Sequence, residues 1–311
     1  MKSDDRTPLV SVFVATYNQQ AYIRDCLEGI LHQITDFDYE IIIVDDASTD
    51  DNPSIIREYA NRYPDKIRPF LLNENYYRKG KNKFFEIFLP NARGKYVAFC
   101  EGDDFWTFDN KLQRQVDFLE SHPDYSMCCH NFSIKNESSF HRRFKPFAIS
   151  RNSNLSAEEI IVENMVQTAT VVARIDKIES DSDLKEDIYN NRFNFTDIRF
   201  FLSYINSGKV YGFNGYWSTY RINDNGVTSL NLETRVLNNH QLLDKICECY
   251  NHKYAYLKRH IDFHKQLDFW TLSRLQRQYM KAIYHLCQAF AGNPKLFLRT
   301  YFKRYFKFNR I

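Results

Sequence analysis

Two short apolar runs on either side of an amphipathic helix pattern constrain the fold of this chain more than any other feature. Residues 9–15 and 39–44 are rich in β-branched side chains, as is typical of strands buried on both faces of a sheet. Between them, apolar residues recur at three- and four-residue spacing over 23–34, which predicts a helix facing that sheet. This alternation implies right-handed crossovers and a parallel sheet, whose ligand sites lie at the carboxyl ends of its strands.

The alternation continues along the chain. Asn52 and Pro53 supply an N-cap and a first-turn proline for a second helix. Further on, the pattern predicts strands at 67–72, 95–100, 169–173 and 209–216, loop from about 126 to 153, a helix over 195–206, and helices from 232 to 292. We therefore expect an α/β domain over residues 1–230, followed by a helical region over 231–311.

Cysteine usage and the N-terminus bear on the compartment. The seven cysteines are odd in number and scattered, and several lie in apolar runs, so we expect no disulfide framework. The first residues are charged and lead directly into a strand pattern, with neither a signal peptide nor an apolar run long enough to span a membrane. We expect a cytoplasmic protein.

Carboxylates follow two of the predicted strands. Asp45 and Asp46 come directly after 39–44, and Glu101, Asp103 and Asp104 follow 95–100. Gathered at one sheet edge, such side chains suit a hard divalent cation, Mn²⁺ or Mg²⁺, which leaves positions free for phosphates. The alternative is a solvated acidic turn. No G-x-G-x-x-G follows the first strand and no P-loop motif occurs, so we expect phosphate to be held through metal.

Three segments together are characteristic of a known family. Residues 8–18 (PLVSVFVATYN), 44–50 (VDDASTD) and 94–106 (GKYVAFCEGDDFW) resemble, in order and spacing, the family 2 inverting glycosyltransferases with a GT-A fold. Such enzymes are found in bacterial surface-polysaccharide synthesis. The resemblance covers roughly residues 8–230. It implies a GT-A-type fold and transfer of a single sugar from a nucleotide-sugar, most simply a UDP-sugar, to a glycan or lipid-linked acceptor.

The resemblance also implies where the nucleoside binds. Ala15, Thr16 and Tyr17, in the turn after the first strand, would contact it, and Asp46 would read the base with Asp45 beside it. A carboxylate can accept the single imide N–H of uracil, so this assignment is chemically sound. The alternative is that Asp45 and Asp46 only cap the turn before Ser48.

Glu101, Gly102 and Asp103 stand where the family usually has Asp-X-Asp. Asp103 is therefore the expected direct metal ligand, and Asp104 is the second choice. Glu101, one methylene longer than the commoner aspartate, would touch ribose or a metal-bound water.

Asp197 aligns with the catalytic base of similar enzymes. Inversion requires a base because the acceptor hydroxyl loses its proton as it attacks the anomeric carbon. The alternative is a carboxylate favoured by the helix dipole alone. Arg221 could clamp the diphosphate or form a structural ion pair. Asn223 stands where the family often has a histidine that reaches the metal or diphosphate.

The C-terminal residues combine aromatic and basic side chains. After Asp268 the chain has nine basic residues and no acidic one. Over residues 295–311 an aromatic stripe faces a basic side, which predicts an interfacial helix on an anionic membrane surface, the inner face of the cell membrane. The alternative is that this stripe packs on protein. An oligomer is compatible with the sequence.

Two other classes of function are alternatives to a glycosyltransferase. A non-catalytic nucleotide-sugar- or glycan-binding protein on the same fold would be expected to lack Asp103 or Asp197, and both are present. A nucleic-acid-binding role would leave the carboxylates unexplained, so we expect no nucleic-acid partner.

Overall fold

The structure, a computed structural model, describes residues 7–138, 148–163, 165–179, 196–224, 232–249 and 254–298. The chain divides into two compact units. The first comprises Met1–Ile160 and Asn164–Asp224, and the second comprises Ile161–Glu163 and Asn225–Ile311. Each unit is described by itself below.

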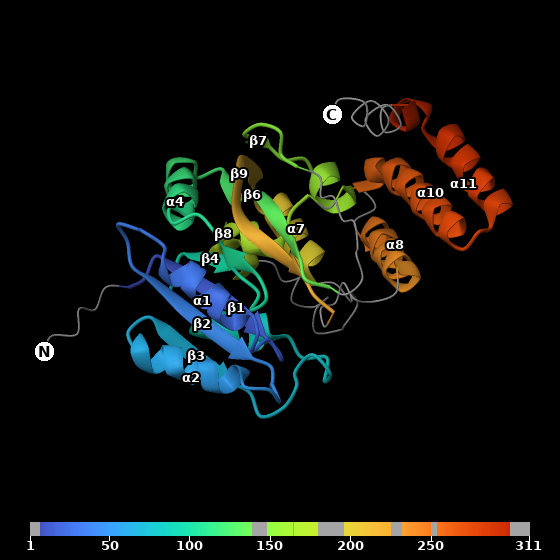
Figure 1. Cartoon of the computed structure of the whole chain (residues 1–311). Coiled ribbons are helices and arrows are strands. Elements are labelled where there is room, and N and C mark those ends of the chain that lie inside the picture. Colours follow the sequence, from blue (N-terminus) through green and yellow to red (C-terminus); the bar gives the residue numbers. More distant parts are fainter. Residues whose placement is uncertain are drawn as a thin grey trace, which may run out of the picture. The chain divides into compact units, whose positions relative to one another are not determined.

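The first half of the sheet is parallel, as the sequence predicts (Figure 1). Strands β3 (Ile67–Leu71), β2 (Tyr39–Asp45), β1 (Val10–Thr16) and β4 (Tyr96–Phe99) lie in that order and pair in parallel. All seven residues of β2 are buried. Ile41 and Ile43 belong to one hydrophobic cluster and Ile42 and Val44 to another, so both faces of the strand are covered.

Helices cover the two faces with different side chains. On one face pack α1 (Ile23–Leu31), α2 (Asn52–Arg62) and α4 (Lys111–Ser121). The other face receives the π-helix η1 (Phe84–Phe88) and α7 (Thr196–Ser207), both rich in phenylalanine. The remaining short elements are α3 (Leu89–Asn91), η2 (Glu158–Val162), η3 (Thr168–Thr170) and α5 (Ile175–Glu179), and the last two residues of η2 are counted in the second unit.

Beyond β4 the strand directions are mixed. The short strand β8 (Val172–Arg174) runs antiparallel to β4 and to β6 (Tyr125–Asn136), and β6 pairs in parallel with β9 (Lys209–Ile222). Strands β5 (Phe105–Trp106) and β7 (Ser153–Asn154) pair antiparallel with β9. Within the described residues this completes a nine-stranded sheet, and the α/β fold class is confirmed.

Two local predictions are wrong. Residues 126–136, expected to be loop, form most of β6, because some of the buried polar side chains in this strand find hydrogen-bond partners within the protein. Asn131, for example, exchanges hydrogen bonds with the backbone of Ile149. Asn52 is not an N-cap, since it is the first residue of α2 and its buried amide donates to Thr16 and Asp45 instead.

The second unit is helical, as expected. It contains α8 (Leu232–Cys249), η5 (Ala255–Leu257), α10 (Lys258–Leu275) and α11 (Tyr279–Gly292). Helices α10 and α11 lie side by side, and Phe263 and Leu267 of α10 pack against Ala289 of α11 (Figure 1). Among the described residues, no helix is both long and apolar enough to cross a membrane.

Candidate functional site

An open pocket of about 200 Å³ lies beside the carboxyl ends of β1 and β4. Its walls come from five parts of the first unit: β1, β4 with the turn after it, the segment 77–84, η3 and α7. The lining residues are Phe13, Ala15, Tyr77, Lys81, Asn82, Lys83, Phe84, Phe99, Glu101, Thr168, Asp197 and Phe200. Of the residues singled out in the sequence, the pocket gathers Ala15, Glu101 and Asp197.

Glu101 and Asp197 both face this pocket. Burial raises the pKa of Glu101 to about 7, opposed by a hydrogen bond from the Thr168 hydroxyl and increased by the negative charge of Asp197. Oε2 of Glu101 is buried and receives no hydrogen bond from the described part of the chain. Asp197, in the first turn of α7, lines the same pocket and remains solvent-accessible, and desolvation by the surrounding protein raises the pKa of its carboxyl. The pair forms an acidic wall with an unsatisfied oxygen.

The two aspartates of the acidic segment have different surroundings. Asp103 is half-buried, and its Oδ2 accepts a hydrogen bond of 2.9 Å from the Asn223 amide. Asp104 is fully buried, and both its oxygens are engaged, Oδ1 by the backbone N–H of Arg221 and Oδ2 by Gln167. Burial raises the pKa of both carboxyls. This arrangement favours Asp103 over Asp104 as a metal ligand.

Gly102 allows the acidic segment to lie close to β1. A Cβ atom built at this position would lie 2.5 Å from Oε1 of Gln19 and 2.6 Å from Oγ1 of Thr16. The backbone N–H of Gly102 also donates to the carbonyl of Ala15. The glycine therefore holds the turn after β4 against the turn after β1, where Tyr17 is half-buried.

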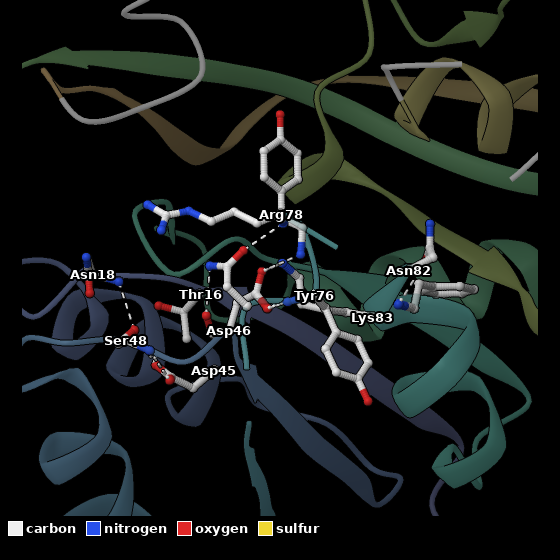
Figure 2. Close-up of polar contacts among 12 residues, drawn as sticks. Thr16, Asn18, Asp45, Asp46, Ser48, Tyr76, Arg78, Asn82 and Lys83 are labelled. Atoms are coloured by element: carbon white, nitrogen blue, oxygen red, sulfur yellow. Dashed lines mark hydrogen bonds and ion pairs between the residues drawn. The ribbon is translucent and has the colours of Figure 1, made fainter. Parts of the chain in front are cut away.

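The adjacent carboxylates of Asp45 and Asp46 have separate partners (Figure 2). Asp45 accepts hydrogen bonds from the backbone N–H and the hydroxyl of Ser48, at 2.9 and 2.6 Å, which are the contacts of a turn cap. Asp46 is 1% exposed and accepts from the backbone N–H groups of Tyr76 and Tyr77 and from Nζ of Lys83. The segment after β3 thus closes over the residue expected to read the base.

Arg221 forms ion pairs. Its guanidinium lies 2.7 Å from Asp25 and 3.2 Å from Glu137, and it stacks near the rings of Tyr22 and Phe105. The side chain is 3% exposed. These contacts are those of a structural ion pair, the alternative to a diphosphate clamp. The backbone N–H of Arg221 nevertheless donates to Asp104 in the acidic segment.

A divalent metal fits these residues only in part. Carboxylate oxygens are the donors that Mg²⁺ and Mn²⁺ prefer, and Glu101 has a buried oxygen without a hydrogen bond from the described chain. Within that same part of the chain, no three His, Cys, Asp or Glu side chains are assembled around a metal position. Such an ion would therefore take one or two protein carboxylates and complete its coordination with phosphate and water.

Sequence reasoning missed several residues that support the acidic segment. Thr168, the first residue of η3, reaches Glu101, and Gln167 just before it reaches Asp104, while Lys83 reaches Asp46. None of the three lies in a recognisable motif. The only available signal for Thr168 and Gln167 was the apolar run 169–173, which predicts a strand beside the sheet but not which polar side chains its first turn presents.

Comparison with known proteins places the chain in a family. The family described as Glycosyl transferase family 2 matches residues 11–220, more than half of the chain. An uncharacterized protein of Mycobacterium tuberculosis is 42% identical over 166 residues, which is 53% of this chain and 46% of the relative. A putative teichuronic acid biosynthesis glycosyltransferase of Bacillus subtilis, TuaG, is 38% identical over 36% of this chain and 42% of its own length. These matches span less than half the length of either relative.

Solved structures share the fold at low identity. TarS of S. aureus, in complex with UDP-GlcNAc, aligns with a TM-score of 0.58 and 18% identity over 93% of this chain and 82% of its own. The mannosyltransferase PcManGT of Pyrobaculum calidifontis, in complex with GDP-Man and Mn²⁺, gives 0.55 and 17% over 92% and 76%. The resemblance seen in the sequence is thereby confirmed. The chain belongs to glycosyl transferase family 2.

Proposed function

We propose that this protein transfers a single sugar from a nucleoside diphosphate sugar, a UDP-sugar, to an acceptor hydroxyl with inversion at the anomeric carbon. The observation that carries the proposal is the pocket in which Asp197 of α7 faces Glu101 at the end of β4. Family membership supplies the reaction class. An inverting transfer needs one base on the side of the acceptor, and Asp197 offers a solvent-accessible carboxylate in the wall of this pocket.

The proposed roles follow the position of each residue. Asp197 takes the proton from the acceptor hydroxyl as that hydroxyl attacks, and its raised pKa makes it a stronger base than an ordinary aspartate. Glu101 contacts the ribose or a metal-bound water through its unsatisfied oxygen. The turn residues Ala15, Thr16 and Tyr17, with Asp45 and Asp46, hold the nucleoside.

Other residues are proposed to act on the metal ion and the diphosphate. Asp103 is the proposed ligand for Mn²⁺ or Mg²⁺, with Asp104 as the second choice. Such a metal ion, when bound, neutralises charge that builds on the departing diphosphate. Arg221, held by Asp25 and Glu137, acts on the diphosphate only indirectly, through the placing of Asp104 by its backbone.

The acceptor is proposed to be a glycan or a lipid-linked saccharide of polysaccharide biosynthesis. The name of the Bacillus relative TuaG refers to teichuronic acid biosynthesis, which supports this class of acceptor. A lipid-linked acceptor would lie at the cytoplasmic face of the membrane, where the basic C-terminal tail would hold the protein. Of that tail, 299–311 lies outside the described residues.

A donor screen tests the proposal. The purified full-length chain is incubated with individual UDP-, GDP- and dTDP-sugars and Mn²⁺ or Mg²⁺, and nucleoside diphosphate release is measured. We expect slow metal-dependent hydrolysis of a UDP-sugar, and a product of inverted anomeric configuration by NMR. Tight binding of a nucleotide-sugar with no release under any condition would instead identify a non-catalytic binding protein.

A further inference from the structure

Helix α11 of the second unit exposes a continuous apolar face. Met280, Ile283, Tyr284 and Phe290 are 79, 55, 58 and 48% exposed, and Cys287 between them is exposed as well. Their spacing of three and four residues places these side chains along one side of the helix. An apolar stripe of this length on a surface normally marks a contact with another molecule.

The folding of the second unit does not account for this face. The opposite side of α11 already packs on α10, where Ala282 and Ala289 are buried and Leu286 adjoins the cluster of Phe263 and Leu267. The helix therefore has two apolar sides. One is used in the unit's own core, and the other faces outward.

The charged side chains of α11 and of the chain after it are all cationic. Lys281 of α11 and the neighbouring Arg274, Arg277 and Lys295 in the sequence are exposed, and within the described residues none of them forms an ion pair with a carboxylate. From residue 269 to the end of the chain, the sequence contains no Asp or Glu at all. Every charged side chain that the chain carries from α11 to its end is therefore positive, although Glu233 of α8 accepts a hydrogen bond from Gln276 in the turn before α11.

We propose that this face of α11 docks on an anionic lipid surface, with its apolar side chains at the level of the headgroups. Helices that bind the surface of a membrane lie in the plane of the interface, with an apolar side in the headgroup region and cationic side chains along it. Each cation near an anionic leaflet adds to the binding free energy. A second copy of the chain is a poorer occupant, because a two-fold contact would place these cations against each other. The inference does not rest on the sugar chemistry, since lipid binding is measured without substrate.

A vesicle experiment tests the occupant. The full-length protein is floated with vesicles of phosphatidylcholine alone or of phosphatidylcholine with about 30% phosphatidylglycerol, which supplies the anionic headgroups. We expect binding only to the anionic vesicles, weakened at least tenfold by Met280→Gln/Ile283→Gln and by Arg274→Glu/Lys281→Glu. The matched control is Ile34→Gln in the first unit, which alters a side chain of 61% exposure and should leave binding unchanged.

A probe within the face distinguishes the remaining occupants. Cys287 is labelled with an environment-sensitive fluorophore in a Cys249→Ser background, and its emission is followed as vesicles are added. A blue shift with anionic vesicles supports the proposal even if the glutamine variant proves unstable. Three results overturn it: no vesicle binding, a signal that depends on protein concentration alone, which indicates a second copy, or a thiol that stays unreactive in the full chain until 299–311 are removed.

Discussion

The Nζ atom of Lys83 lies 2.6 Å from Oδ2 of Asp46, and this ion pair ties the segment after β3 to the carboxyl end of β2. The backbone N–H groups of Tyr76 and Tyr77 donate to the same carboxylate. Three donors therefore already occupy the side chain proposed to recognise the base. A nucleoside that donates to Asp46 must share or displace them.

Lys83→Met should lower the free energy of unfolding by about 1–3 kcal/mol, because it leaves a buried carboxylate without its cation. Chemical denaturation measures the change. Lys81→Met removes the comparable but exposed pair with Glu74 and should cost less than about 1 kcal/mol. Equal effects of the two substitutions would show that the buried Lys83–Asp46 pair contributes no more to the free energy of unfolding than an exposed ion pair.

Asp197→Asn should reduce sugar transfer by about 10²–10⁴-fold, because the amide keeps the size of the side chain but cannot accept the proton of the acceptor. Binding of UDP, followed by calorimetry, should change little. A variant that transfers at a near-normal rate would exclude Asp197 as the base.

Asp103→Ala and Asp104→Asn should show which of the two aspartates binds the metal and which stabilises the fold. The first should abolish the increase in UDP affinity that Mn²⁺ produces, since it removes the proposed direct ligand. The second should keep that increase but lower the free energy of unfolding by about 1–3 kcal/mol, because Asp104 accepts buried hydrogen bonds from Arg221 and Gln167. The reverse pattern in titrations with and without metal would assign the ligand role to Asp104.

Lys111 should make the free energy of unfolding depend on pH in the range above pH 7. It is fully buried, with Nζ 4.1 Å from the centre of the Trp106 ring, and burial lowers its pKa to about 7 from the usual 10.5. Between these values the unfolded chain binds a proton that the folded chain does not, so this residue's contribution to stability rises with pH, by up to about 1.4 kcal/mol per unit. Below pH 7 both states are protonated and the contribution is constant.

Lys111→Met should therefore be more stable than the wild type at pH 7, with a difference that narrows toward pH 10. Urea denaturation at several pH values measures it. Lys95→Met, at an exposed lysine paired with Glu120, serves as the control and should not reproduce the trend. A difference that is independent of pH would mean that Lys111 stays charged in the folded protein.

The parallel half of the sheet could be predicted because its strands are short, apolar and buried on both faces. Such strands leave a local signal in the sequence, as the fully buried β2 shows. Strand β6 left no such signal. It carries buried His130 and Asn131, and the Asn131 side chain finds its partner at Ile149, 18 residues further on, so the polar residues of this strand suggest a loop when only local sequence is considered.

The candidate site shows the same limit. Asp45, Glu101 and Asp103 stand in motifs and could be named from the sequence. Their supporting residues could not, because Thr168 and Asn223 reach the acidic segment from 67 and 120 residues away. Asn52 illustrates the ambiguity of a single pattern, since an asparagine before a proline is typical of an N-cap, yet here its amide supports Asp45.

The hydrogen bonds around Asp104 also have a consequence for the order of events during translation. Its partners Gln167 and Arg221 follow it by 63 and 117 residues, and Asn223 follows Asp103 by 120. A nascent chain that has just completed β4 therefore carries its carboxylates without the donors that later surround them. Strand β9, made near the end of the first unit, decides when the growing polypeptide can first assemble a working site.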